Sequence, residues 1–583
     1  MATQEKTLTE RIITMLLTPV ITYILCRLIL WGLFSVVGFY KMLGESAGPV
    51  VHWLAVVMAV YGSWVALSGQ RKKFGIEKAS TASKTGRKVK ESVYTIETHT
   101  PAVPRIHLTN PFRGVLILGG AGAGKSRSLI EPIIQQTIQQ GYAGLLYDFK
   151  FPTLAKVADM AMRETNTPRL KYFVNFEDLT RSHRVNPLHP DTMPTQSHAD
   201  EYARSILYNL KPDAIKKADF WVDSAQSYLT ALIWFLREEY PQYCTLPHVM
   251  ALAFQPTADV VALLSTNPET RGTVASLRES VQRKAEGQTA GVVSTLQTAL
   301  RKINTKEIVW VLSGDDFSLN INDPQEPKFV TLGNSPTLSS TFAPVIALLT
   351  TVALKQMNQQ GKAPSAVILD EAPTLFIPNF EQLPATGRSN HIATIFGAQD
   401  ISQIEDMYGR SKKDALLSNL NNQFYGRVGH RETAQYIADL WGREYVQQRT
   451  EGQNESSRSR DFETTQSRSV SHSYTERSRV RIQDVLELQT GEFYGQLVDS
   501  DFSSFKAQIK APEPAPLPEI VPVTTATSQA VKKNFIRIQE EIESLLANHR
   551  PGTPITTPAI APAQVNGQAQ NGQVRHPGES LDF

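Results

Sequence analysis

Eight consecutive residues have the composition and order of a phosphate-binding loop. They are Gly119-Gly120-Ala121-Gly122-Ala123-Gly124-Lys125-Ser126, which match G-x-x-x-x-G-K-[ST] at each fixed position. Glycines in this arrangement let backbone N–H groups converge on phosphate oxygens, and a following helix adds its positive dipole end. We expect Lys125 to reach the β- and γ-phosphates and the Ser126 hydroxyl to bind Mg²⁺. The segment therefore predicts a site for a nucleoside triphosphate such as ATP.

A pair of carboxylates further along the chain would complete such a site. Asp370 and Glu371 directly follow the apolar run 366–369, which is typical of a buried strand. At the tip of that strand Asp370 would join the Mg²⁺ shell, and Glu371 would polarise the attacking water. With the upstream loop, the pair predicts an enzyme that hydrolyses the bound nucleotide.

Two more polar residues are candidates for the same chemistry. Gln399 follows the next apolar run, 392–397, where an amide would sense the γ-phosphate or position water, or else hydrogen-bond a loop. Arg388 lies between the two apolar runs, after Gly387. NTPases often receive such an arginine from a neighbouring subunit to stabilise the transition state. Spacing alone leaves a surface arginine equally open.

The elements around these residues alternate between strand and helix patterns. Apolar runs at 115–118, 143–148, 171–175 and 329–333 predict further buried strands, and helical periodicity follows at 128–140 and 344–359. This alternation predicts an α/β fold with a parallel sheet and its ligand at the carboxyl ends of the strands. Helical periodicity without strand alternation predicts an inserted all-α domain at 191–304. The nucleotide-binding domain then comprises 75–190 and 305–511.

Two apolar stretches near the N-terminus predict a membrane anchor. They cover about 12–41 and 50–68, and each is long enough to cross a hydrocarbon core of ~30 Å. Arg71, Lys72 and Lys73 follow the second stretch, so the positive-inside rule places the rest of the chain in the cytoplasm. We therefore expect residues 1–74 to form a two-helix transmembrane anchor.

Composition excludes several other classes of site. The 583 residues carry a net charge of +3, which by itself gives no sign of nucleic-acid binding. The two cysteines, Cys26 and Cys244, exclude a disulfide scaffold and a cysteine-based zinc site.

Two late segments are low in large apolar residues. Residues 447–481 are rich in Ser, Arg, Thr and Glu, which predicts a solvated, flexible insertion. Residues 512–583 predict a Pro-rich linker, one amphipathic helix over about 529–549, and a largely disordered tail. That helix would dock either on a partner or on the main domain.

The whole arrangement resembles the coupling-protein ATPases of type IV secretion and conjugation. The likeness covers about residues 12–510 and includes the two spans, the phosphate-binding loop and the downstream Arg388 and Gln399. It also includes an Asn-Pro-Leu segment at 186–188 and Phe220-Trp221 with Ala225 at the start of the helical insertion. One departure is Asp148-Phe149-Lys150-Phe151, where the family often has Asp-Pro-Lys-Gly. This departure leaves the roles of Asp148 and Lys150 open.

The resemblance implies a RecA-like P-loop NTPase that forms a homohexamer at the bacterial inner membrane, with its ATPase domain cytoplasmic. Such a motor couples ATP hydrolysis to the movement of single-stranded DNA, with its attached relaxase, into a type IV secretion channel. For Arg388 the resemblance favours an arginine finger. Two alternatives are a substrate-receptor scaffold whose ATP site mainly drives assembly, and a septal translocase of double-stranded DNA. Turnover stimulated by nucleic acid would distinguish a motor from a scaffold.

Overall fold

The structure is a computed structural model that describes residues 83–84, 93–165, 170–457, 464–513 and 516–549. The chain divides into two units, Met1–Ser83 and Lys84–Phe583, and the second unit holds the predicted nucleotide site. Both predicted membrane spans and the predicted disordered tail beyond residue 549 lie outside the described residues.

A mostly parallel sheet organises the second unit, which confirms the predicted α/β fold. From β14 to β6 its strands lie in the order β14-β13-β10-β4-β9-β8-β5-β7-β6. The strands from β10 to β6 pair in parallel, whereas β13 and β14 are added antiparallel beside β10. In sequence order the strands are β4 (Val115–Leu118), β5 (Ala143–Asp148), β6 (Leu170–Val174), β7 (Lys328–Gly333), β8 (Ser365–Leu369), β9 (Ile392–Ala398), β10 (Asn422–Tyr425), β13 (Glu492–Gln496) and β14 (Phe502–Gln508).

The central strands are buried along their whole length. Each residue of β4, β5, β7, β8 and β9 is buried, as expected for parallel strands covered by helices on both faces. Helices α4 (Glu131–Gln139) and α5 (Thr153–Glu164) pack against the sheet and against each other.

Among the described residues, one helix is long and apolar enough to cross a membrane. It is α15 (Ser339–Met357), and 78% of its apolar window is buried inside the protein. The helix packs along α6 (Gln196–Leu210), where Ser205 Oγ lies 3.0 Å from Thr351 Oγ1. We therefore assign α15 to the core of the unit.

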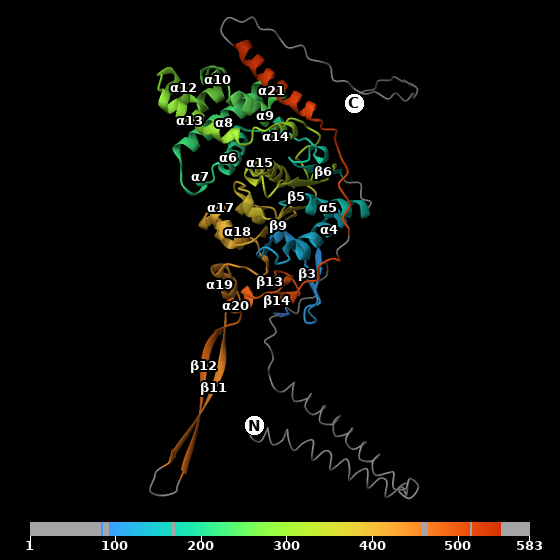
Figure 1. Ribbon diagram of the computed structural model, residues 1–583, viewed down its shortest axis with the longest axis vertical. Coiled ribbons are helices and arrows are strands. Elements are labelled where there is room, and N and C mark those ends of the chain that lie inside the picture. The colour runs from blue at the N-terminus through green and yellow to red at the C-terminus, as the bar shows by residue number, and fades with distance from the viewer. Residues whose placement is uncertain (1–82, 85–92, 166–169, 458–463, 514–515, 550–583) are drawn as a thin grey trace, which may run out of the picture. The chain divides into compact units, whose positions relative to one another are not determined.

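Helices fill the sequence between β6 and β7. They run from α6 to α14 (Lys306–Leu312), and α8 (Phe220–Glu239) packs on α6, α9 (Leu246–Ala253) and α13 (Glu286–Arg301) (Figure 1). The insertion and the sheet share one continuous apolar core.

Helix α21 (Ser528–His549) lies on this helical insertion, against α9, α10 (Thr257–Leu264) and α14 (Figure 1). Its buried face includes Ile538 and Ile542. Two polar contacts also join α21 to the insertion. Asn534 Nδ2 donates to Ser313 Oγ at 2.9 Å, and Glu541 Oε2 lies 2.9 Å from His248 Nε2. The sequence left open whether this helix docks on a partner or on the main domain. In the structure it packs on the main domain of its own chain.

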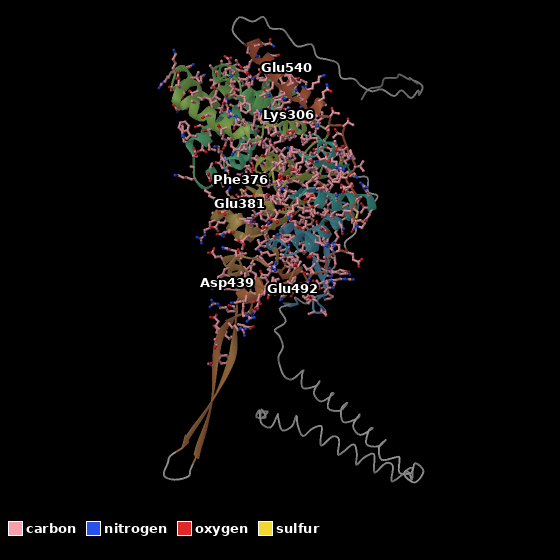
Figure 2. The ribbon with its side chains drawn as sticks, viewed as in Figure 1. Lys306, Phe376, Glu381, Asp439, Glu492 and Glu540 are labelled. Carbon is pink, nitrogen blue, oxygen red and sulfur yellow. The ribbon has the colours of Figure 1, made fainter. Side chains whose placement is uncertain are left out.

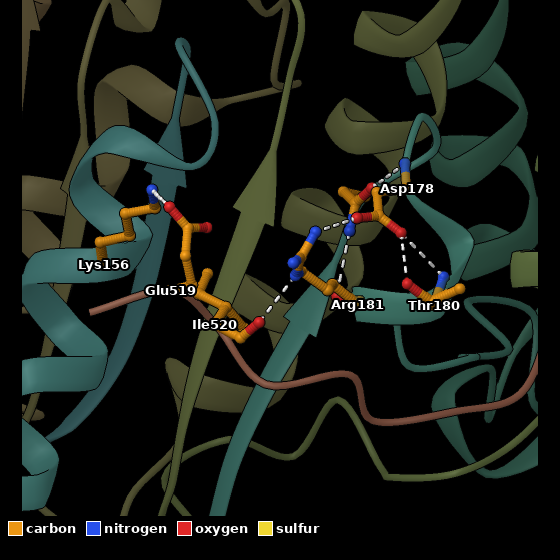
Figure 3. Close-up of polar contacts among 7 residues, drawn as sticks. Lys156, Asp178, Thr180, Arg181, Glu519 and Ile520 are labelled. Carbon is orange, nitrogen blue, oxygen red and sulfur yellow. Dashed lines mark hydrogen bonds and ion pairs between the residues drawn. The ribbon is translucent and has the colours of Figure 1, made fainter. Parts of the chain in front are cut away.

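The segment leading to α21 crosses the edge of the sheet near β6. Ile520 is buried with Ala155 and Phe173, and its carbonyl accepts a hydrogen bond of 2.7 Å from Arg181 Nε (Figure 3). Beside it, Glu519 forms an ion pair with Lys156 (Figure 3). These contacts hold the segment against α5 and the residues after β6.

Most of the segment predicted as a flexible insertion, 447–481, forms a long hairpin instead. Its strands are β11 (Arg443–Ser457) and β12 (Thr464–Ser478), which pair antiparallel (Figure 1). The prediction missed the hairpin because it relied on apolar alternation, whereas the ladder is formed by backbone groups that every residue type carries.

Candidate active site

The predicted phosphate-binding loop lies between β4 and the start of a helix. Gly119 N donates to Ala398 O at 3.1 Å, and Gly120 N donates to Arg427 O at 2.7 Å. The helix begins with a π-helical turn, Ser126–Ile130, and continues as α4. The loop is thus held by β9 and by the residues that follow β10.

A second loop, which the sequence analysis missed, packs on the first. Gly491 N donates to Ala123 O at 2.9 Å, and Thr490 Oγ1 donates to Gly122 O at 3.0 Å. These residues precede β13, which lies two strands from β4 in the sheet. A threonine and a glycine before a strand indicate only a turn, so no local signal would have placed them beside the phosphate-binding loop.

Gly124 is a position where glycine is required. Its φ is +93°, and an added Cβ would lie 2.9 Å from Gly491 N. We expect Gly124→Ala to strain the loop by about 1–3 kcal/mol, which corresponds to a loss of roughly 5- to 150-fold in nucleotide affinity. Titration with a fluorescent ATP analogue measures this loss. The control is Gly429→Ala, where an added Cβ meets nothing within 4 Å; equal losses in both variants would contradict the prediction.

The two carboxylates meet the phosphate-binding loop at the carboxyl ends of the strands. Ser126 Oγ donates to Asp370 Oδ1 at 3.3 Å across 244 residues of sequence. Lys125 Nζ lies 3.4 Å from Glu371 Oε1 and donates to Gly119 O at 2.5 Å. The contacts form because a single strand, β9, separates β4 from β8.

Burial favours the neutral form of Asp370. It raises the pKa of Asp370 to about 6, and the adjacent Glu371 carboxylate acts in the same direction, while Lys125 opposes both. A cation bound by Asp370 would favour the ionised carboxylate. The donor set of one hydroxyl and one carboxylate fits Mg²⁺, which keeps several waters and binds few protein oxygens.

Asp148 lies at the carboxyl end of β5, where its carboxylate is bonded to the backbone of the residues that follow. Its carboxylate accepts hydrogen bonds from the backbone N–H groups of Lys150, Leu154 and Ala155 at 3.2, 2.9 and 3.0 Å. Burial raises the pKa of Asp148 to about 7 although these bonds oppose the shift. The carboxylate thus holds the β5–α5 loop and the start of α5, while the Lys150 side chain is exposed.

Gln399 emerges at the same edge of the sheet as the carboxylates. It directly follows β9, whose last residues pair with Leu118 and Leu369 of the two flanking strands. An added Cβ at Gly397 would lie 3.0 Å from Leu369 O and 3.5 Å from Asp370 Cα. This close approach places the chain before Gln399 against the carboxylate pair.

Arg388 lies at the amino ends of the parallel strands, opposite the carboxyl ends where the phosphate-binding loop and the two carboxylates meet. It precedes β9, whose seven residues span about 20 Å at a rise of ~3.3 Å per residue. The arginine is exposed, and its carbonyl accepts a 3.3 Å hydrogen bond from His391 N. The His391 ring packs edge-on, 5.4 Å away, against Phe112, which lies just before β4. The fold therefore does not bring Arg388 to the phosphate-binding loop of its own chain.

Comparisons with known proteins agree with this architecture. Residues 71–493 match the model of a family described as type IV secretory system conjugative DNA transfer. Coupling protein TraD of Escherichia coli (strain K12) is 20% identical over 253 residues, which cover 42% of this chain and 33% of TraD. The chain thus matches only about a third of the length of that curated relative.

Solved structures of the plasmid coupling protein TrwB have a similar fold. The complex with the non-hydrolysable ATP analogue ADPNP has a TM-score of 0.55 at 14% identity and covers 76% of this chain and 100% of that one. The complex with ADP and Mg²⁺ has a TM-score of 0.54 at 16% identity and covers 74% and 90%. At such identities the likeness shows the fold alone.

Proposed function

Because this chain belongs to the type IV secretory system conjugative DNA transfer family, we propose that it is an ATPase that pumps single-stranded DNA into a type IV secretion channel. In this proposal the DNA carries its attached relaxase, and the N-terminal residues 1–74 anchor the chain in the bacterial inner membrane by two spans. The observation that carries the proposal is the meeting of Lys125 and Ser126 with Asp370 and Glu371 at one edge of the sheet.

Each residue of the site has a distinct task in hydrolysis. The backbone N–H groups of residues 119–126 and the Lys125 ammonium bind the phosphates of ATP. Ser126 and Asp370 would hold Mg²⁺, which when bound supplies positive charge to the transferred phosphoryl group. Glu371 accepts a proton from the attacking water, and Gln399 orients that water. Solved relatives that contain ADP with Mg²⁺ or an ATP analogue support this choice of ligands.

A ring explains why Arg388 lies far from its own site. A head-to-tail interface that closes into a ring repeats one contact per subunit. In that geometry the edge of the sheet that carries Arg388 faces the phosphate-binding loop of the next subunit, and the arginine stabilises the charge of the transition state there. We propose a homohexamer of this kind.

A DNA-stimulated ATPase activity is the expected result that tests the proposed function. Single-stranded DNA should raise the ATPase rate of the detergent-purified full-length protein several-fold, and the stimulation should fall as salt rises, because DNA contacts release counterions. Glu371→Gln protein purified in parallel controls for contaminating ATPases. An ATPase rate that DNA leaves unchanged would support the alternative of a substrate-receptor scaffold.

A further inference from the structure

The backbone of Glu371 adopts a conformation that few non-glycine residues take. Its φ is +56° and its ψ is +48°, in the left-handed region, where an L-residue with a Cβ is disfavoured. The residue is also buried, with 8% of its surface exposed. Conformations of this kind persist where the surroundings hold them, so the contacts of the next residues bear directly on the carboxylate.

Thr374 holds the Glu371 backbone with two hydrogen bonds. Its N–H donates to Glu371 O at 3.0 Å, and its hydroxyl donates to the same oxygen at 2.7 Å. Tyr147 OH lies 2.7 Å from the Thr374 hydroxyl oxygen. Since the single proton of Thr374 is already donated to Glu371, Tyr147 is the donor in this second bond.

The same chain of bonds extends to a third strand. Asn334 Nδ2 donates to Tyr147 OH at 2.8 Å, so the tyrosine hydroxyl both accepts and donates. Tyr147 lies on β5, and Asn334 directly follows β7. The loop that carries Glu371 is therefore tied to the two strands beyond β8.

Two residues after Thr374, the loop is hydrogen-bonded to the helical insertion. Phe376 N donates to Asn209 Oδ1 at 2.9 Å, and Asn209 Nδ2 donates to Phe376 O at 2.7 Å. Asn209 is on the last turn of α6. The Phe376 ring packs against Tyr208 of the same turn, with ring centroids 5.6 Å apart, and Figure 2 marks the position of Phe376 in the unit. One amide thus forms a closed pair of bonds with the backbone, as a strand neighbour would.

The segment that follows this turn of α6 carries exposed charges of both signs, and Lys216 Nζ lies 3.1 Å from Asp406 Oδ1. Helix α7 (Asp213–Lys216) begins three residues after Leu210, and Lys216 and Lys217 are exposed. A ligand that moves this part of the insertion would also move Asn209 and, through Phe376, the segment that holds Glu371.

We infer that Thr374 and Asn209 are positioning residues for Glu371, so that the helical insertion sets the geometry of the carboxylate that activates water. The inference rests on the proposed function, because it assigns a role in hydrolysis. It adds that the insertion controls the chemical step through two named side chains, without contacting the nucleotide.

Thr374 is tested by a pair of substitutions that differ in the hydroxyl. Thr374→Val keeps the shape and removes the hydroxyl bonds, and we expect kcat to fall roughly 10- to 100-fold, since small misplacements of a reacting group have effects of this size. Affinity for ADPNP should stay within about threefold, because Thr374 contacts none of the residues that bind phosphate. Thr374→Ser keeps the hydroxyl and should restore most of the rate. A Thr374→Ser variant as slow as Thr374→Val would overturn the assignment.

Asn209 is tested against a control that removes a different side-chain hydrogen bond of α6. Asn209→Leu removes both bonds to Phe376, and we expect a loss of roughly tenfold in kcat with unchanged ADPNP affinity. Thr351→Val removes a buried hydrogen bond between α15 and Ser205 of α6 and should leave kcat unchanged. In the Glu371→Gln background, Asn209→Leu should cause no further loss in single-turnover rate, because the residue acts through Glu371. An equal additional loss there would refute the inference.

Hydrogen exchange decides the same question without hydrolysis. With ADPNP bound, Asn209→Leu should accelerate amide exchange in residues 372–377, whereas Thr351→Val should not. Unchanged exchange at 372–377 in Asn209→Leu would overturn the inference even if the protein proved to be no ATPase. Failure of the proposed function appears separately, as wild-type turnover that DNA does not stimulate.

Discussion

Glu371→Gln protein should bind ATP as tightly as the wild type and hydrolyse it roughly 10²–10⁴-fold more slowly, the usual contribution of a general base. The amide has the shape of the carboxylate, and its oxygen can still accept a hydrogen bond from Lys125, which lies 3.4 Å from Glu371 Oε1 in the wild type. What the amide cannot do is accept a proton from water. Single-turnover hydrolysis of radiolabelled ATP, with ADPNP titration beside it, separates the chemical step from binding.

The matched control for this variant is Glu381→Gln. Glu381, labelled in Figure 2, undergoes the same chemical change ten positions later, and Lys412 Nζ lies 3.8 Å from its Oε1. Its carbonyl accepts a hydrogen bond from Asn419, which lies against Gly114 at the start of β4, whereas the phosphate-binding loop follows the end of β4. Its hydrolysis rate should stay within about twofold of the wild type, because the amide keeps the size of the side chain and Glu381 is not one of the residues assigned to the phosphates, Mg²⁺ or the attacking water. Loss of ATP binding in Glu371→Gln would mean that the glutamate holds the fold of the site and does not act as the base.

Arg388→Ala and Lys125→Ala subunits should each be inactive alone and recover hydrolysis when mixed. We expect Lys125 to act on the phosphates bound by its own chain. Arg388 lies about 20 Å from that site, at a rise of ~3.3 Å for each residue of β9, so we expect it to serve the neighbouring site. In a mixed ring, an intact Lys125 from one subunit can meet an intact Arg388 from the next. At equal amounts about a quarter of the interfaces should be competent.

The mixing experiment needs proof that subunits exchange. Native mass measurement of differently tagged Arg388→Ala and Lys125→Ala chains first establishes mixed rings, and ATPase rates are then measured over a range of ratios. An arginine that acts within its own chain gives no recovery at any ratio, because each site lacks one of its two charges. Mixed rings without recovered hydrolysis would disprove the arginine-finger assignment.

The residues whose place in the candidate site was predictable are those that belong to a local sequence pattern. Lys125 and Ser126 follow from glycine spacing, and Asp370 from its place after an apolar strand. Their meeting depends on strand order, which brings β4 and β8 to either side of β9. Periodicity predicts strands but does not specify their neighbours, so the contact became visible only in the fold.

The residues that were not predictable make contacts that no local sequence pattern specifies. Thr374, Asn209 and Gly491 are common residue types, and no local pattern marks their hydrogen bonds to Glu371, Phe376 and Ala123. The hairpin β11–β12 was missed for a related reason, because its pairing depends on backbone groups that carry no sequence signal. The docking of α21 stayed open because an amphipathic face specifies that a helix packs, not what it packs on.

The contact between Thr490 and the phosphate-binding loop has a consequence for biosynthesis. Thr490 and Gly122 are 368 residues apart, and ribosomes add about 5–20 residues per second, so the two halves of the site emerge roughly 20–70 s apart. For most of that interval, until residues 392–425 have been made, β4 lacks both of its sheet neighbours, β9 and β10, and its apolar strand is exposed in the nascent chain. The nascent chain therefore cannot bind ATP before most of it has been translated. Until then its exposed apolar strand needs protection by chaperones.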